Sequence, residues 1–453
     1  MAIPTLLIHG WSATSASFRG LSAFLQQQGF NVHDINLADY LSLNDEISLW
    51  DVSWAMKKAL QEHDLPTGHH SFNAIVHSTG GLVVRDFLRQ FCRDEQGRPD
   101  ASRTPIRNLL MLAPANFGSP LAGLGKSMLG RLGKGWRWDG FMETGKELLN
   151  ALELGSSISY ELALRDLFDP AFPIFDPQHI CTTVLVGSNG YEDTFKRMMH
   201  ENGSDGTVRV ATANLNAHYL KVDFGNPTEP RTVEVPRNGP DIAFGVLDRN
   251  HSTITQDDRQ QREDWRRLVM QALDVTPSNY AAHVQDCEQV TRQTFQRGQG
   301  LLGKAQKCFH EYMHVVFRVS DQHGNPIPDY FIEFYQEDGD RADAVMQKIH
   351  CEILEKVAPY SQDNSYRSFF FDLTDLQAAL EDSGGSLRVD MSVVAANLSA
   401  DIVYLNPPDM PTSGVRVFDA DTRLFFRPNR PMLIDLTLYR ETSDRVFRIG
   451  REE

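Results

Sequence analysis

The sequence has few cysteines, fewer basic than acidic residues, and no long apolar run. Its five cysteines are widely spread and include no CxxC pair, which argues against a disulfide framework and against a cysteine-based zinc or redox site. No stretch reaches the ~18 apolar residues of a transmembrane helix, and the N-terminal MAIPTLLIHGW lacks a basic leader. We therefore expect reduced thiols and a cytoplasmic location by default, with export by a signal-independent route left open.

Acidic residues outnumber basic ones, 60 Asp and Glu against 44 Lys and Arg, which gives a net charge of −16. This charge repels phosphate polyanions and anionic lipid surfaces at long range, so nucleic acid is not an expected partner. The 453 residues are 41% apolar, an ordinary globular value, and exceed the ~250 residues that one core usually serves. Two domains are expected.

Short aliphatic runs alternate with segments of helical period in the first part of the chain. This pattern is typical of parallel strands joined by crossover helices, and so predicts an α/β fold with a mostly parallel sheet. Helices are expected at 17–29 and 82–91. The expected strands are 5–9, 31–35, 73–77, 108–113 and 182–186.

Residues 116–178 form an excursion too long for a simple crossover, with many glycines and with Trp136 and Trp138. We expect a cap or lid insertion there. A helix in the segment 257–274 is expected to close the first domain, 1–277, and 278–309 is expected to be a helical connector. Residues 310–453 show short strands and turn signals, which predicts an all-β, antiparallel, sandwich-like domain.

Residues 72–82, FNAIVHSTGGL, read as an apolar strand that ends at Ser78 and turns into a helix through two glycines. This is the layout of a nucleophile elbow, in which a strained turn exposes the serine oxygen. A side chain two positions after the serine would strike the helix or strand, and Gly80 meets that requirement. Val76 replaces the glycine usual two positions before the serine, so a slightly splayed strand and helix are expected.

A catalytic triad needs a base and an acid that follow the nucleophile in the order Ser, Asp, His. His251 lies in DRNHSTI just before the last predicted helix, and Asp205 lies in the glycine-flanked turn NGSDGTV. The backbone N–H groups of Trp11, in LLIHGW, and Thr79 are expected to form the oxyanion hole. Other candidates remain open, for the acid Asp193, Asp223 and Asp248, and for the base His200 and His218.

These motifs together resemble the lipase and esterase branch of the α/β-hydrolases over about residues 1–275. The HG loop, the HSTGGL elbow, the SDG-V acid turn and the NH-x-x-I base loop carry the resemblance. A looser likeness of HSTGGLVVR is to GPI inositol-deacylase-type and phospholipase-type hydrolases. The resemblance implies a core without the first two antiparallel strands of the full fold, a site without metal or cofactor, and a lid that covers the acyl pocket and opens toward lipid or micelle surfaces.

The sequence therefore predicts a carboxylic ester hydrolase that acts on acyl esters or lipids through an acyl-enzyme. A first alternative is a phospholipase or lysophospholipase, including a secreted lipid-attacking effector. A second is a zinc peptidase, since His310, Glu311 and His314 form an H-E-x-x-H motif. A third is a catalytically silent lipid-binding module. The C-terminal domain is expected to serve surface docking, binding of a protein partner or self-association.

Overall fold

The computed structural model describes residues 3–8, 18–35, 45–63, 65–123, 145–190, 201–224, 231–297, 307–336, 347–382, 389–396, 401–405, 415–418 and 425–446. The chain forms two compact units, the first from Met1–Ala217 and Arg237–Glu311 and the second from His218–Pro236 and Tyr312–Glu453. The second unit thus takes in a short segment that lies, in sequence, inside the range predicted for the first domain.

The first unit is built on a six-stranded sheet in the order β2-β1-β3-β4-β5-β8, and every neighbouring pair is parallel. Strands β3, β5 and β8 are buried along their whole length, as expected where helices cover both faces. The predicted α/β class is confirmed; β8 is the one strand of this sheet that the sequence analysis did not anticipate. The strands are β1 (Pro4–Ile8), β2 (Asn31–Ile35), β3 (Phe72–His77), β4 (Ile106–Leu112), β5 (Cys181–Gly187) and β8 (Ala243–Leu247).

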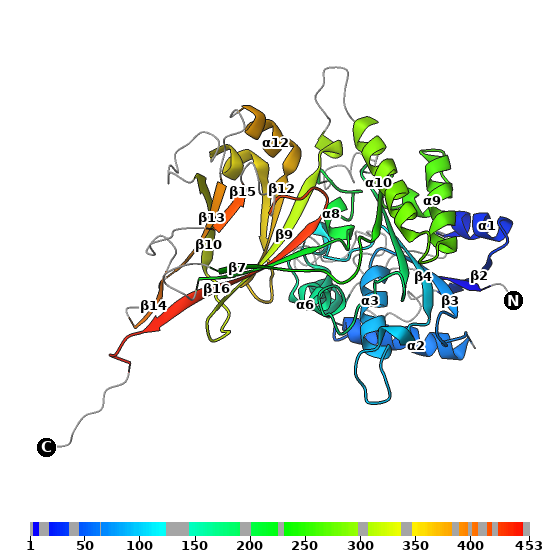
Figure 1. Cartoon of the computed structure of the whole chain (residues 1–453), viewed down its shortest axis with the longest axis horizontal. Helices are drawn as coiled ribbons and strands as arrows, with labels where there is room; N and C mark the ends of the chain where they lie inside the picture. The colour runs from blue at the N-terminus through cyan, green and yellow to red at the C-terminus, as the bar shows by residue number, and fades with distance from the viewer. Residues whose placement is uncertain are drawn as a thin grey trace, which may run out of the picture. The chain divides into compact units, whose positions relative to one another are not determined.

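Helices flank this sheet, with α1 and α9 on one side and α2 and α3 on the other (Figure 1). Helix α1 packs on α9 through the rings of Phe24 and Trp265, whose centroids are 5.7 Å apart. Helix α2 begins with a capping box formed by Ser48 and Asp51, which satisfies amide groups of its first turn. The helices are α1 (Arg19–Gln27), α2 (Leu49–Glu62), α3 (Gly80–Phe91), α5 (Lys146–Leu152), α6 (Ser157–Asp166), α8 (Val210–Ala213) and α9 (Arg262–Asp274).

The predicted cap insertion is described only in part. Helices α5 and α6 lie in it, and both bury most of their apolar side chains. Its glycine-rich middle, with Trp136 and Trp138, lies outside the described residues.

Helix α10 (Tyr280–Arg297), which falls in the predicted connector, covers the edge of the sheet at β8. The Thr291 hydroxyl accepts a hydrogen bond from the Val246 amide at 2.9 Å, and the Thr294 hydroxyl donates to the Val246 carbonyl at 2.9 Å. The Tyr280 hydroxyl accepts from the amide of Ala243. Side chains of a helix therefore satisfy backbone groups that an edge strand would leave open to pairing with another chain.

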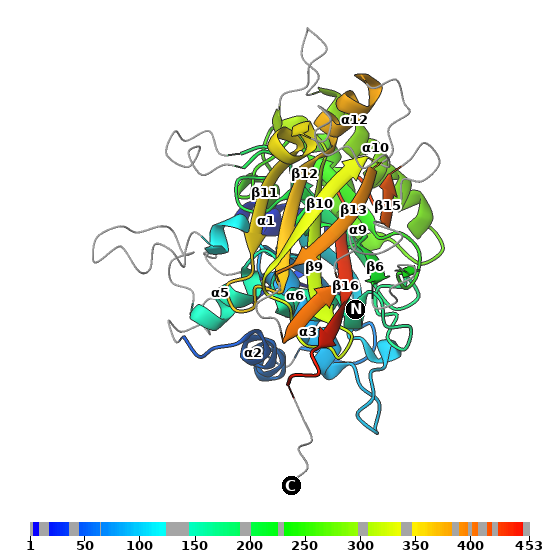
Figure 2. The same cartoon turned by 90° about the vertical axis from the view of Figure 1, so that its left-hand side faces the viewer.

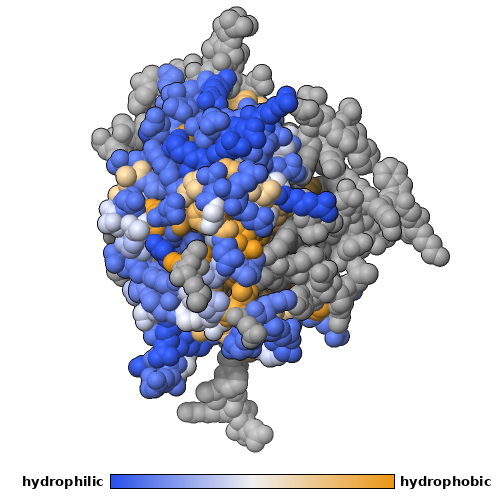
Figure 3. All heavy atoms as spheres, turned by 90° about the vertical axis from the view of Figure 1, so that its right-hand side faces the viewer, coloured by the Kyte–Doolittle hydropathy of each residue, from blue (hydrophilic) through white to orange (hydrophobic). Residues whose placement is uncertain are grey.

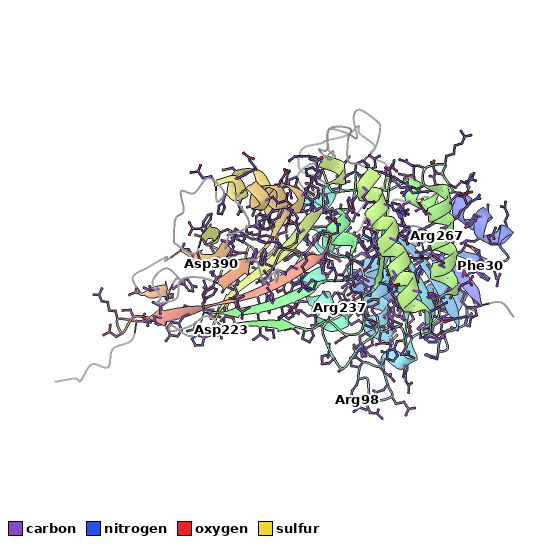
Figure 4. All side chains as sticks on the ribbon, turned by 45° about the horizontal axis from the view of Figure 1, so that its top comes forward. Phe30, Arg98, Asp223, Arg237, Arg267 and Asp390 are labelled. Atoms are coloured by element: carbon purple, nitrogen blue, oxygen red, sulfur yellow. The ribbon has the colours of Figure 1, made fainter. Side chains whose placement is uncertain are left out.

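Helices α9 and α10 are also joined at their surfaces by charged side chains. Arg267, labelled in Figure 4, places Nη1 2.9 Å from Oδ2 of Asp286. The face of the first unit turned toward the viewer in Figure 3 is mainly hydrophilic, with hydrophobic residues gathered in smaller areas between. Among the helices of the described ranges, none combines the length and apolar character needed to cross a bilayer.

The second unit contains a seven-stranded sheet in the order β11-β12-β9-β16-β6-β7, with β14 paired to β16, and a three-stranded sheet in the order β10-β13-β15. Figure 2 shows the smaller sheet in front of the larger one. The strands are β6 (His218–Asp223), β7 (Arg231–Val235), β9 (Tyr312–Asp321), β10 (Tyr330–Gln336), β11 (Leu354–Pro359), β12 (Tyr366–Asp372), β13 (Val389–Ala395), β14 (Ile402–Leu405), β15 (Val415–Phe418) and β16 (Pro431–Thr442).

An aromatic core joins these two sheets, since Phe334 of β10 meets Phe371 of β12 edge to face at 5.5 Å. The predicted β-rich C-terminal domain is confirmed, with two corrections. Strand β16 runs parallel to both β9 and β6, so the larger sheet is mixed rather than antiparallel. The unit also holds a helix, α12 (Leu373–Asp382), and a π-helical turn, Ile349–Ile353.

Candidate active site

Ser78 follows the last residue of β3 and has a backbone φ of 56°. This left-handed conformation costs a residue with a side chain on the order of 1–3 kcal/mol, so the surroundings must hold it in place. They do so with hydrogen bonds on both sides, because the Ser78 amide donates to the Leu112 carbonyl at 3.1 Å and its carbonyl accepts from the Ala115 amide at 3.1 Å. The end of β4 thus fixes the strained turn that the sequence predicts.

The glycines after Ser78 open helix α3, with Gly80 as its first residue. A Cβ on Gly81 would lie 2.6 Å from Cβ of Pro114, so the second glycine is what lets the helix approach the chain after β4. Val76 is fully buried in β3, where the strand register places it between Ile8 of β1 and Met111 of β4.

The side chains of Ser78, His251 and Asp205 form one hydrogen-bonded chain. His251 Nε2 lies 3.1 Å from Ser78 Oγ, and His251 Nδ1 lies 2.8 Å from Asp205 Oδ2. With Nδ1–H donating to the carboxylate, Nε2 is left to accept the serine proton. The exposed fractions are 4% for Ser78, 8% for His251 and 0% for Asp205, so this chain is shielded from water.

A tight turn holds Asp205 in place. Its second carboxylate oxygen, Oδ1, accepts from the amides of Thr207 at 2.9 Å and Val208 at 2.7 Å. Gly203 and Gly206, on either side, have φ values of 65° and 94°, which residues with a side chain rarely adopt. The turn therefore leaves Oδ2 facing His251 while the amides of Thr207 and Val208 stabilise the charge on the other oxygen.

The loop that carries His251 is held from inside by the buried side chain of Arg249. Its guanidinium donates to the carbonyls of Thr253 at 2.7 Å and Gln256 at 2.6 Å, and it lies over the Trp265 ring at 4.9 Å. Burial lowers the pKa of Arg249 to about 10, so the group remains a cation at neutral pH. This charge-assisted bonding fixes the loop before helix α9.

Gly187, at the end of β5, allows close packing of two segments: the loop that carries His251 and the turn that carries Asp205. A Cβ there would lie 2.0 Å from the Arg249 carbonyl oxygen and 3.1 Å from Cβ of Asp205. Only glycine fits this position without moving one of the two loops. The sequence analysis did not single it out, although a glycine at the end of a buried strand is a signal of close backbone approach.

The other triad candidates lie elsewhere or have other contacts. Asp248 Oδ1 accepts from the Asn189 side chain at 3.1 Å, and Asp223 lies in β6 of the second unit. His218, also in β6, places Nδ1 3.3 Å from Oε1 of Glu234. The remaining candidates, Asp193 and His200, lie outside the described residues.

Of the two predicted oxyanion donors, Thr79 is described and Trp11 lies outside the described residues. Thr79 is the N-cap of α3 and is 3% exposed. Amide groups at the start of a helix have no acceptor within the helix, and they carry the positive end of its dipole. The Thr79 N–H is therefore in a place suited to an anion that forms next to Ser78.

The HEYMH segment does not have the geometry of a zinc-protease helix. A short 3-10 turn, Lys307–Phe309, precedes it, and β9 begins at Tyr312 and includes His314. Side chains four residues apart are neighbours on a helix, whereas along an extended strand they stand about 13 Å apart, too far to bind one ion together. The zinc-peptidase alternative therefore loses its structural basis, because the apolar run after the motif makes a strand.

A buried ion pair next to the site was also not anticipated. Arg85, in α3, bonds Asp166 at the end of α6 through Nε–Oδ2 at 2.8 Å and Nη2–Oδ1 at 3.0 Å. Its Nη1 donates to the Asn116 carbonyl at 2.9 Å. The pair ties the helix that follows the nucleophile to the described part of the cap insertion. Arg85 belongs to the HSTGGLVVR stretch, but no sequence pattern pointed to its partner.

No family model matches this sequence, and no curated protein matches it. Among solved structures, phospholipase PlaB from Legionella pneumophila is similar with a TM-score of 0.78 and 23% sequence identity, over 98% of this chain and 96% of PlaB. PlaB in complex with thio-NAD gives a TM-score of 0.77 and 24% identity over the same shares of the two chains. The chain therefore has the fold of PlaB over both of its units, and its first unit has the α/β-hydrolase fold as predicted.

Proposed function

We propose that the protein is a serine-dependent carboxylic ester hydrolase that acts on acyl esters or lipids. The observation that carries the proposal is the buried chain from Ser78 Oγ through the His251 imidazole to the Asp205 carboxylate, with separations of 3.1 and 2.8 Å. A serine next to a base that a carboxylate orients is the arrangement of an activated nucleophile.

The reaction proceeds in two halves. Ser78 Oγ attacks the ester carbonyl carbon while His251 Nε2 takes the hydroxyl proton, and Asp205 stabilises the imidazolium that forms. His251 then gives the proton to the departing alcohol, which leaves an acyl group on Ser78. Water, deprotonated by the same imidazole, attacks the acyl carbon; the bond from this carbon to Ser78 Oγ then breaks, His251 returns the proton to Oγ, and the carboxylic acid leaves.

The tetrahedral intermediate of each half carries a negative charge on the former carbonyl oxygen. The Thr79 amide at the start of α3 is the proposed first donor to this oxyanion, and the Trp11 amide is the proposed second. Loss of one such donor typically costs about 3 kcal/mol of transition-state stabilisation. The residues of the triad need no metal or cofactor for any of these steps.

Phospholipids are the second candidate substrate class, beside simple acyl esters and triacylglycerols. This candidate is favoured by the similarity to a phospholipase along nearly the whole of both chains, including the second unit. The cap insertion 116–178 is proposed to cover the acyl pocket and to meet a membrane or micelle surface. Fatty acid release from phosphatidylcholine vesicles, compared with triacylglycerol emulsions, separates the two classes.

Hydrolysis of p-nitrophenyl esters from acetate to palmitate tests the proposal. The wild type should be active, Ser78→Ala and His251→Ala should each lose at least about 10³-fold in kcat, and a chelator should have no effect. Ser102→Ala, at an exposed serine, is the control and should match the wild type. Wild-type rates in Ser78→Ala would overturn the proposal.

A further inference from the structure

His77 is the last residue of β3 and directly precedes the nucleophile Ser78. Its side chain is buried, with 6% exposed, and its Nε2 lies 3.0 Å from the backbone carbonyl oxygen of His251. The centroids of the His77 and His251 rings lie 4.5 Å apart, with an interplanar angle of 43°. Since a carbonyl oxygen only accepts, Nε2 must carry a proton and donate it.

Together with two other hydrogen bonds, this one holds both the backbone and the ring of His251. The His251 amide donates to the Asp205 carbonyl at 3.0 Å, and the His251 carbonyl accepts from His77. The peptide groups on both sides of the base are therefore anchored. With its backbone fixed, and with Nδ1 bound to the Asp205 carboxylate, the ring has little freedom to carry Nε2 away from Ser78.

The hydrogen bond to the His251 carbonyl comes from His77, the residue directly before the nucleophile Ser78. His77 is also held, since its ring meets Phe18 edge to face at 6.1 Å between centroids. A displacement of the loop that carries His251 relative to β3 therefore strains this bond as well as the contact from Ser78 Oγ to His251 Nε2. Misplacement of a catalytic group by about 1 Å can cost ~100-fold in rate, so such an anchor bears directly on catalysis.

We infer that His77 is a positioning residue that sets the place of His251 relative to Ser78 through this backbone hydrogen bond. The inference rests on the proposed function. His77 takes no part in proton transfer, because its Nε2 is occupied by the carbonyl. Position 77 therefore requires a side chain that places a hydrogen-bond donor where Nε2 now lies, next to the His251 carbonyl; the donor need not belong to an imidazole.

Three substitutions at position 77 test this requirement. His77→Gln places an amide nitrogen close to the location of Nε2, His77→Asn places its nitrogen short of the carbonyl, and His77→Phe keeps a ring without a donor. His283 provides a matched control, since it is 4% exposed and its Nε2 lies 2.8 Å from Thr183 Oγ1. His283→Phe removes a comparable buried hydrogen bond on α10, away from the triad residues in the sequence and outside the site described above.

The readouts are kcat and KM for p-nitrophenyl butyrate, with kcat normalised to active sites titrated by a fluorophosphonate. His77→Gln should keep kcat within about threefold of wild type, because the hydrogen bond is retained. His77→Asn and His77→Phe should lower kcat by about 10- to 100-fold with little change in KM. His283→Phe should lower the melting temperature and leave the normalised kcat near that of the wild type.

Equal kcat values in His77→Gln, His77→Asn and the wild type would overturn the inference, as would an equal kcat loss in His283→Phe. Normalisation to titrated sites keeps the comparison valid if the Phe variant folds poorly. Ser78→Ala, assayed in parallel, separates the two levels: if it is fully active, the proposed function fails, and if it is inactive while all His77 variants are normal, only the role of His77 fails.

Discussion

The buried ion pair between Arg85 and Asp166 permits a quantitative test of how the nucleophile helix is held. The two side chains are 0% and 1% exposed, and the guanidinium meets the carboxylate with two parallel hydrogen bonds. Removal of one partner from a buried pair leaves an uncompensated charge and typically costs about 3–5 kcal/mol. Arg85→Met also removes the hydrogen bond to Asn116, which adds about 1 kcal/mol.

We therefore expect Arg85→Met and Asp166→Leu each to lower the free energy of unfolding by about 3–5 kcal/mol. The double variant leaves no buried charge, so its loss should be smaller than the sum of the two single losses by on the order of 2 kcal/mol or more. The assay is urea unfolding at pH 7 of the wild type, both single variants and the double variant, followed by tryptophan fluorescence. Additive losses, or single losses below about 1 kcal/mol, would show that the pair does not act as a buried, mutually compensating unit.

Substitutions at Asp205, Gly187 and His283 give three further predictions. Asp205→Asn should lower kcat by roughly 10³–10⁴-fold, whereas Asp248→Asn should change kcat little. A large loss of kcat in Asp248→Asn and a small one in Asp205→Asn would show that Asp248, and not Asp205, is the acid of the triad. Gly187→Ala should abolish most esterase activity and lower the melting temperature, because its Cβ would lie 2.0 Å from the Arg249 carbonyl oxygen; unchanged activity and melting would refute the close approach. Burial lowers the pKa of His283 to about 4, below the ~6.5 of an unfolded histidine, so between these pH values the unfolded chain binds a proton that the folded chain does not. Stability should thus fall as the pH drops from 6.5 to 4, by up to roughly 3 kcal/mol, and urea unfolding of His283→Gln should lack this part of the loss.

The sequence predicted the elements that carry local signals. The strand before Ser78, the two glycines after it and the glycine-flanked turn at Asp205 are written in consecutive residues, and each adopts the expected local structure. The order of nucleophile, acid and base along the chain, together with the glycine-flanked turn at Asp205 and the place of His251 before the last predicted helix, favoured three residues that the structure brings within hydrogen-bonding distance. Their catalytic role stays a prediction until activity is measured.

What the sequence did not predict depends on pairings between distant segments. Strand β6 lies in the sequence between two strands of the first sheet, β5 and β8, yet its Leu220 and Val222 belong to the hydrophobic core of the second unit. A hydrophobic alternation says which face of a strand is buried, but not against which sheet. Likewise the threonines of α10 read as polar surface residues, because only the fold places Thr291 and Thr294 at the edge of β8.

The contacts of His77 and Arg85 were not predicted either, because they too join segments that are distant in the sequence. His77 and Arg85 both stand in the stretch that identified the elbow, but their partners, His251 and Asp166, lie 174 and 81 residues further along the chain. A single sequence without aligned relatives does not reveal such pairings. The tertiary structure is needed to bring them together.

Covalent labelling identifies the nucleophile without depending on the choice of substrate. The protein is incubated with diethyl p-nitrophenyl phosphate and digested, and the peptides are analysed by mass spectrometry. We expect a diethylphosphoryl adduct on Ser78, formed much more slowly in His251→Ala and absent in Ser78→Ala. An adduct on a different residue, or no adduct in a protein that hydrolyses esters, would contradict the assignment of Ser78 as the nucleophile.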